Sequence, residues 1–212
     1  MINLDCNSLK WKQHVNFLGV TFDNHLTFKS HIDYVCSNIS RNLGILFKTR
    51  YYFTFNIRLQ LYYSLIYPCI LYGILVWGCN YPTRLHPVYI LQKRALRFIF
   101  LLPYNSHVTH LFKDYGILTV YQIHKLITLS FIYKHRHNLL PNVFNNFFQI
   151  SNFSHNSRQL DAYSVFSSRT NYARFATRYN APFLWNNLPI CIRAAISFHK
   201  FVQSCKLWLS KI

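Results

Sequence analysis

The carboxylates that could carry acid–base or metal chemistry are few and widely spaced. The 212 residues contain no Glu, and the five acidic residues are Asp5, Asp23, Asp33, Asp114 and Asp161. No two of them have the spacing of a local general acid/base pair or Mg²⁺ site. A polymerase or nuclease centre would have to be assembled from scattered Asp side chains. We therefore expect no catalytic residue and no metal site in this chain.

Thiols and imidazoles are also scattered. The six Cys form no C-x-x-C pair, and the close His pairs, His107/His110 and His135/His137, have no further ligand nearby. Reduced thiols and packing or surface histidines are the expectation. Because the N-terminus has no basic-then-apolar signal sequence, we expect an intracellular protein, nuclear or cytoplasmic, rather than a secreted one.

The charge balance favours a polyanionic partner. The chain has 23 Lys and Arg against 5 acidic residues, a formal net charge of +18. Residues 1–82 contribute seven cations and three Asp, whereas residues 83–212 contribute sixteen cations and two Asp. A positive field of this size attracts nucleic acid or an anionic membrane surface.

Hydrophobic periodicity predicts a mainly α-helical fold. Residues 14–22 are a strand candidate, and helical spacing follows over 26–50, 84–101, 119–137 and a last helix capped by Ser197. Residues 140–180 lose periodicity and predict irregular structure, and 185–189 predict a compact turn. Trp185 and Trp208 are expected to be core anchors.

Residues 59–83 contain no charged side chain and leave two alternatives open. An apolar run of nearly the length needed to span a bilayer, flanked by Arg58 and Arg84, would suit a membrane protein with a basic tail. The same run also suits a buried helix of a bundle, kinked by Pro68 and ended near Gly73 or Gly78.

The helix predicted over 84–101 places three cations one turn apart, Lys93, Arg94 and Arg97. This row suits phosphate contact and equally suits a solvated helix face. A looser set of cations lies in the irregular region, at Arg169, Arg174 and Arg178.

Four blocks of the sequence together resemble the C-terminal part of non-LTR, jockey-like retrotransposon reverse transcriptases. The first block resembles the family's FLG-x-x-x-D-x-x-L-x-W-x-x-H-I segment and contains Phe17, Leu18, Gly19, Val20, Asp23, Leu26, Phe28, His31 and Ile32. Phe28 stands where the family usually has Trp. The second block contains Leu61, Tyr62, Ser64, Pro68, Leu71, Tyr72, Gly73 and Trp77, and the third is Gln92–Arg97. The fourth contains Ala181, Pro182, Trp185, Asn186, Leu188 and Pro189.

The resemblance implies an end-of-palm strand over 1–25, a helical thumb-like bundle over 26–103 and a basic, partly irregular helical region over 104–212. It implies a truncated part of an RNA-directed DNA polymerase that binds RNA, DNA or an RNA/DNA template–primer duplex. The family's metal-binding carboxylates lie upstream of the first block, so Mg²⁺ and catalysis are expected only of the missing palm. The two rival expectations are an inactive, unfolded relic and the single-span membrane protein.

Overall fold

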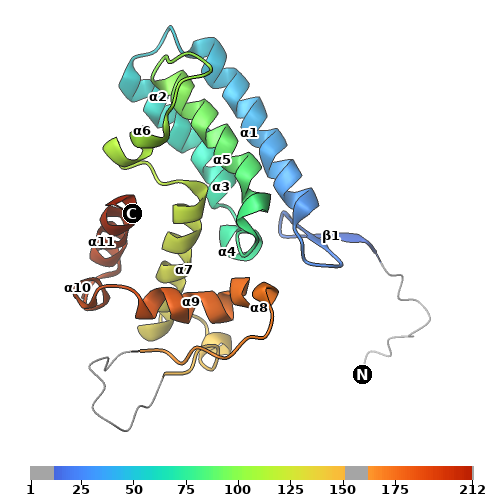
Figure 1. Cartoon of the computed structure of the whole chain (residues 1–212), viewed down its shortest axis with the longest axis vertical. Helices are drawn as coiled ribbons and strands as arrows, with labels where there is room; N and C mark the ends of the chain where they lie inside the picture. Colours follow the sequence, from blue (N-terminus) through green and yellow to red (C-terminus); the bar gives the residue numbers. More distant parts are fainter. Residues whose placement is uncertain (1–11, 151–161, 212) are drawn as a thin grey trace.

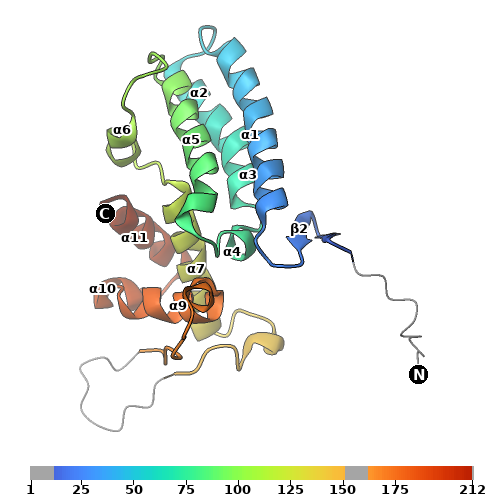
Figure 2. The same ribbon diagram turned by 45° about the vertical axis from the view of Figure 1, so that its right-hand side comes forward.

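The structure, a computed structural model, describes residues 12–150 and 162–211. It is mainly helical, as the sequence predicts, with one small two-stranded sheet. Figures 1 and 2 show a bundle of long helices at one end of the molecule, with helices of the C-terminal region gathered around α7 at the other.

The predicted strand over 14–22 is instead a hairpin. Strands β1 (His14–Phe17) and β2 (Val20–Asp23) pair antiparallel, with His14 opposite Asp23 and Phe17 opposite Val20. The two turn residues, Leu18 and Gly19, both have positive φ, at 47° and 76°. A two-residue turn of this hand matches the twist of the paired strands, and the glycine adopts it without strain.

The helix predicted over 26–50 is confirmed as α1 (Lys29–Thr49). Its apolar stripe, which repeats every three or four residues, is buried and consists of Ile32, Val35, Ile39, Leu43 and Leu46. Asp23 at the end of β2 fixes the approach to this helix, because its carboxylate accepts hydrogen bonds from the Phe28 N–H at 2.7 Å and the Thr27 N–H at 3.0 Å.

The uncharged segment is divided into several short helices. Helix α2 (Phe55–Leu61) continues through a π-helical turn, η2 (Tyr62–Ile66), into α3 (Tyr67–Leu71), and α4 (Ile74–Trp77) follows a break at Gly73. The wide turn comes just before Pro68, which has no N–H to donate to the preceding turn. Across the described residues, the helices all fall short of the length and apolarity needed to cross a membrane.

Helix α5 (Pro82–Ile99) packs along α1 and beside α2 and α7. Gln92 is completely buried in α5 and joins it to η2 and α7. Its Nε2 donates to the Tyr62 hydroxyl at 3.0 Å, and its Oε1 accepts from the Val120 N–H at 2.7 Å. A short helix, α6 (Thr109–Asp114), then leads to α7.

Helix α7 (Val120–Arg136) is the axis of the second half, and its predicted extent is confirmed. Thr119 and Gln122 form a capping box at its start. Helix α11 (Phe198–Lys211) packs on it, beginning where Ser197 accepts from the Lys200 N–H at 3.3 Å, so the predicted Ser197 cap is also confirmed. The rings of Tyr133 and Phe201 stack with centroids 4.3 Å apart.

Of the region predicted to be irregular over 140–180, residues 151–161 lie outside the described residues, and the described part is only partly irregular. It contains a 3₁₀ turn, η3 (Asn142–Phe144), helix α8 (Asn171–Phe175) and the start of α9 (Thr177–Asn186). Helix α9 runs through Trp185, so the turn predicted at 185–189 begins later, and α10 (Ile190–Arg193) follows it. Trp185 is completely buried, as expected of a core anchor, and Trp208 is partly buried against the same core.

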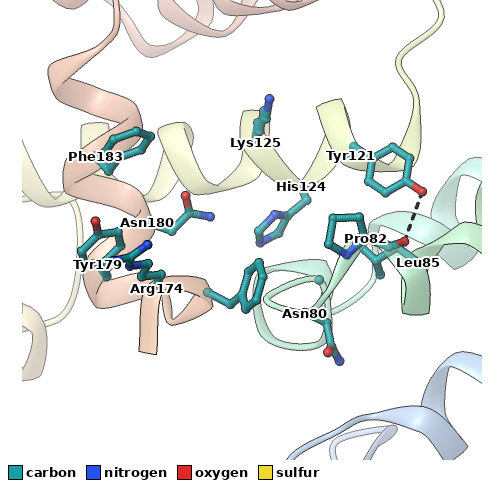
Figure 3. A pocket seen from close by; sticks show the side chains of 12 residues that line it. Asn80, Pro82, Leu85, Tyr121, His124, Lys125, Arg174, Tyr179, Asn180 and Phe183 are labelled. Atoms are coloured by element: carbon teal, nitrogen blue, oxygen red, sulfur yellow. Dashed lines mark hydrogen bonds between the residues drawn. The ribbon is translucent and has the colours of Figure 1, made fainter. Parts of the chain in front are cut away.

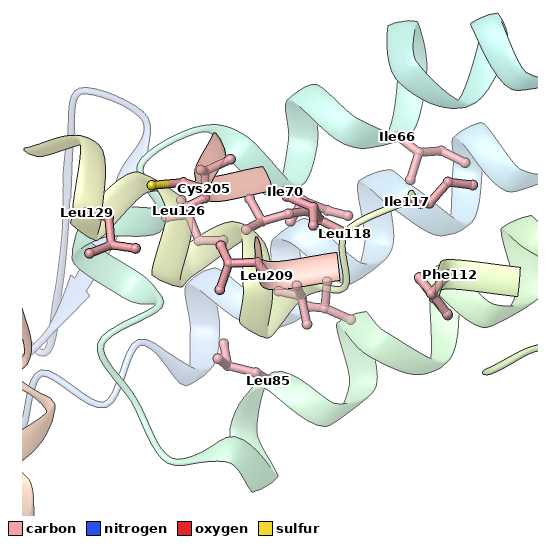
Figure 4. Close-up of a cluster of buried hydrophobic side chains, with 14 of the residues drawn as sticks. Ile66, Ile70, Leu85, Phe112, Ile117, Leu118, Leu126, Leu129, Cys205 and Leu209 are labelled. Carbon is pink, nitrogen blue, oxygen red and sulfur yellow. The ribbon is translucent and has the colours of Figure 1, made fainter. Parts of the chain in front are cut away.

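Buried side chains from both sides of residue 103 belong to one hydrophobic core. Figure 4 shows Ile70 and Leu85 from the first part beside Leu126 and Leu209 from the second. A shared core does not test whether the chain is organised as two regions divided at residue 103, and this division stays a prediction.

Candidate nucleic-acid interface

The three cations predicted on α5 lie outside its buried face. That face comprises Leu85, Val88, Gln92, Ala95, Leu96, Phe98 and Ile99. Arg94 is exposed, whereas Lys93 and Arg97 are half-buried. The guanidinium of Arg97 is oriented by its Nε, which donates to the Ser106 carbonyl at 3.1 Å.

Each of these cations lies near an aromatic ring. Lys93 Nζ is 4.8 Å from the Tyr89 ring centroid, and the Arg97 guanidinium carbon is 5.8 Å from that of Tyr104. Arg94 lies 5.9 Å from the Phe98 ring. Attraction to a ring face holds a cation in place while leaving its donors free for an anion.

Arg50, at the end of α1, joins this row and was not among the predicted site residues. Its guanidinium carbon lies 4.0 Å from the Phe47 ring and 5.5 Å from the Phe98 ring, which Arg94 also approaches. The Phe47 and Phe98 rings pack 5.1 Å apart and bring α1 and α5 together. The Phe47–Phe98 contact links residues far apart in sequence and has no local signal. The spacing of Phe47 and Arg50, one helical turn, is the only part of this arrangement that the sequence shows. We call Arg50, Lys93, Arg94 and Arg97 the α5 cation row.

The second predicted set lies elsewhere. Arg169 precedes α8, Arg174 lies in α8, and Arg178 lies in the first turn of α9, and all three are exposed. In both views α8 and α9 lie toward the opposite end of the molecule from the last turns of α5 (Figures 1 and 2). The structure therefore does not bring the two sets together into one patch.

The second half of the described chain is entirely cationic in its charged side chains. Residues 115–150 and 162–211 contain no Asp or Glu. Their Lys and Arg residues are Lys125, Lys134, Arg136, Arg169, Arg174, Arg178, Arg193, Lys200, Lys206 and Lys211. This half therefore carries a strong positive field.

Residues of the first and second blocks position the hairpin against the bundle. The Tyr72 hydroxyl donates to the Leu18 carbonyl at 2.5 Å, and Trp77, completely buried, donates from Nε1 to the Tyr72 carbonyl at 2.7 Å. His31 is buried and its Nδ1 accepts from the Thr21 N–H at 3.4 Å. Burial lowers the pKa of His31, so it is neutral at neutral pH.

The remaining motif residues are also structural, except at the tip of the hairpin. Pro189 begins the turn into α10, and Asp23 is engaged with Thr27 and Phe28. Burial raises the pKa of Asp23, but these hydrogen bonds outweigh it and the net pKa is lowered. Phe17 and Leu18 at the hairpin tip are exposed, at 63% and 75%.

One thiol–imidazole pair has the composition of a nucleophilic site. Cys79 Sγ lies 3.5 Å from His124 Nε2 and 3.2 Å from the Thr177 hydroxyl. Burial raises the pKa of Cys79, and it lowers the pKa of His124 to about 4, with a further contribution from the Lys125 charge. Both groups are therefore neutral near pH 7, and a reactive thiolate is not favoured.

The residues described here do not fit the metal site that an RNA-directed DNA polymerase needs. No group of three or more His, Cys, Asp or Glu side chains within residues 12–150 and 162–211 could hold a metal ion. The described carboxylates, Asp23, Asp33 and Asp114, belong to three separate elements.

Comparison with known proteins supports the resemblance to retrotransposon RNA-directed DNA polymerases. The chain is 30% identical over 122 residues to a probable RNA-directed DNA polymerase from transposon BS of Drosophila melanogaster. It is 26% identical over 145 residues to the RNA-directed DNA polymerase from mobile element jockey of the same organism. These matches cover 56% and 66% of this chain but only 14% and 16% of the relatives. No protein-family model and no solved structure matches the chain. The chain is thus similar to a limited region of transposon-encoded RNA-directed DNA polymerases.

Proposed function

We propose that this chain is the thumb-like part of a retrotransposon RNA-directed DNA polymerase and holds the RNA/DNA template–primer duplex. The observation that carries the proposal is the α5 cation row, presented by a rigid helix in a chain similar to RNA-directed DNA polymerases. Catalysis stays with carboxylates that the described residues do not supply.

A duplex of RNA and DNA offers a wide, shallow minor groove, which proteins recognise by its shape and backbone. Such recognition needs cations at fixed positions on a rigid element. Buried Gln92 fixes α5 to its neighbours on the face opposite the solvent, and the aromatic rings limit the motion of the cations. Lys93 to Arg97 spans about 6 Å along the helix axis. A strand with the phosphate spacing of duplex DNA, ~3.4 Å along the axis, would place about two phosphates over this span.

The C-terminal cations support the same partner in a different way. Arg169, Arg174 and Arg178 are exposed in a region without described acids, so they add to the long-range field that attracts a polyanion. Because they lie apart from the α5 cation row, we assign them to a second contact with the nucleic acid. Binding would take place in the nucleus or the cytoplasm.

The test is binding of a blunt, fluorescently labelled RNA/DNA hybrid, measured by anisotropy. The double variant Lys93→Ala/Arg94→Ala should weaken binding roughly tenfold at moderate salt, since it removes two phosphate contacts. The matched control is Arg41→Ala/Lys48→Ala, which removes the same charge from exposed positions of α1. If both double variants weaken binding equally, the affinity depends on net charge alone and not on the position of the cations on α5. That result would contradict the proposal.

A further inference from the structure

A cleft separate from the α5 cation row lies where the start of α5 meets α7, α8 and α9. It has a volume of about 450 Å³, within the range of about 300–1,000 Å³ of small-molecule sites. Its lining combines aromatic and apolar side chains with amides and cations and includes no acidic residue.

The floor of the cleft is built by a close approach of two elements. A Cβ on Gly78 would lie 2.7 Å from His124 Cδ2 and 2.4 Å from the Ile74 carbonyl oxygen, so only glycine fits there. His124 is buried and faces the cleft from α7, and Asn180 faces the same space from α9 (Figure 3). An imidazole and an amide offer both donors and acceptors to a polar, planar ligand.

The walls are aromatic, and the rim on the side of α8 is cationic. Phe175 packs edge-on against Tyr81 with centroids 4.7 Å apart, and the rings of Tyr179 and Phe183 lie nearly parallel, at 14°. Arg174 stands beside Tyr179 at the rim and is exposed, so it can meet an anion outside the cleft (Figure 3). Aromatic walls with a cation at the rim suit a base that enters and a phosphate that stays outside.

The cleft is connected to the α5 cation row through two rings. Lys93 Nζ lies over the Tyr89 ring, and the Tyr89 and Tyr121 ring centroids are 5.6 Å apart. Tyr121 lines the cleft, and its hydroxyl donates to the Pro82 carbonyl at 3.3 Å. Tyr89 and Tyr121 therefore form an aromatic link between Lys93 and the lining of the cleft.

We propose that this cleft binds one unpaired nucleotide of the nucleic acid, with its base between the aromatic walls and His124 and its phosphate at Arg174. The proposal rests on the proposed function and adds a site for single-stranded nucleic acid beside the duplex contact. Sequence preference is not part of it, because stacking accepts any base.

The experiment compares three probes on the full chain. They are a blunt RNA/DNA hybrid, the same hybrid with a short unpaired RNA overhang, and the hybrid with an overhang of abasic nucleotides. The overhang should tighten binding roughly tenfold, because one stacked base is bound. The abasic overhang carries the same phosphates and should not restore that gain.

Variants test whether the tighter binding of the overhang probe depends on the cleft. Asn180→Phe fills the cleft and should abolish the overhang gain while leaving binding of the blunt hybrid unchanged. The control Gln203→Phe adds the same ring at an exposed position of α11 and should keep the gain. If Asn180→Phe lowers the melting temperature, Phe175→Ala, which removes a wall instead of filling the cleft, provides the same comparison.

Two results would overturn the inference and are distinguishable from each other. If the blunt hybrid binds but the overhang adds nothing, or adds the same in Asn180→Phe, the cleft does not hold a base and the duplex contact stands. If none of the three probes binds, the proposed function fails and the cleft proposal fails with it.

Discussion

Arg58 has a structural role that its place in the sequence does not predict. It flanks the uncharged segment, yet its side chain is only 8% exposed and donates to three backbone carbonyls. The acceptors are Ile99 at 2.7 Å, Arg50 at 2.8 Å and Phe53 at 2.7 Å. It therefore ties the ends of α1 and α5 to the turn before α2, the part of the bundle that also holds Arg50 in place.

We expect Arg58→Lys to lower the free energy of unfolding by about 2–4 kcal/mol. A lysine ammonium lacks the planar fork that reaches all three carbonyls, and it leaves buried acceptors unpaired. Chemical denaturation measures the change. Arg41→Lys, at an exposed position of α1, is the control and should change the free energy by less than about 0.5 kcal/mol. Equal stabilities for the two variants would show that the three hydrogen bonds contribute little.

His124 gives the protein a predictable pH dependence. Burial lowers its pKa to about 4 in the folded protein, below the usual value of 6.5 that the unfolded chain retains. Above pH 6.5 neither state is protonated, and stability is complete. Between about pH 6.5 and 4 only the unfolded state takes up the proton, so the free energy of unfolding falls, by roughly 3 kcal/mol at most.

The measurement is chemical denaturation near neutral pH and at about pH 4.5. His124→Gln should lose a large part of the decrease that the wild type shows between these conditions, while the exposed His86→Gln should retain all of it. A decrease unaffected by His124→Gln would assign the pH dependence to other groups, among them His31, whose pKa burial also lowers.

Residue-level predictions from the sequence succeeded where helical periodicity decided them. The spacing of Lys93, Arg94 and Arg97 placed them off the buried face of α5, and the structure confirms this. Arg50 and the cleft residues other than Arg174 were missed because their partners come from distant segments. Neither the Arg50–Phe98 contact nor the approach of Asn180 to His124 has a local signal.

At the scale of elements, the long helices were predictable because each has an apolar stripe of helical period. The hairpin was predicted as one strand because its turn residues, Leu18 and Gly19, lie inside a run of strand-forming residues. The turn is evident only from their positive φ angles. Helix α9 was missed because its sequence is mixed, with Asn180 and an internal Pro182. Its stability comes from Trp185 and contacts with α7, which local sequence does not reveal.

Gln92 provides the test of how α5 is fixed. We expect Gln92→Leu to lower the free energy of unfolding by about 2–3 kcal/mol, because the Val120 N–H and the Leu118 carbonyl lose their buried partner. Gln60→Leu, an exposed change on α2, is the control. The variant should also weaken hybrid binding if a rigid α5 is needed. Unchanged stability in Gln92→Leu would show that packing alone fixes the helix.

At the scale of the whole molecule, the described residues form one hydrophobic core, to which helices from both halves of the chain contribute. The rival expectation of an unfolded relic is tested by the thermal stability of the chain. We predict a single cooperative thermal transition in the helical circular dichroism signal, since the two halves share buried side chains. Two separate transitions would support the division at residue 103, and a featureless scan would contradict folding of this chain.

The most direct test of duplex binding by the α5 cation row is the salt dependence of hybrid affinity. Neutralising about five phosphates predicts that log K falls with log salt at a slope of roughly −3.5 to −4.5. Lys93→Ala/Arg94→Ala should make the slope shallower by roughly 1.5, about 0.7–0.9 for each phosphate contact removed. A slope near zero, or one that this double variant leaves unchanged, would contradict the account.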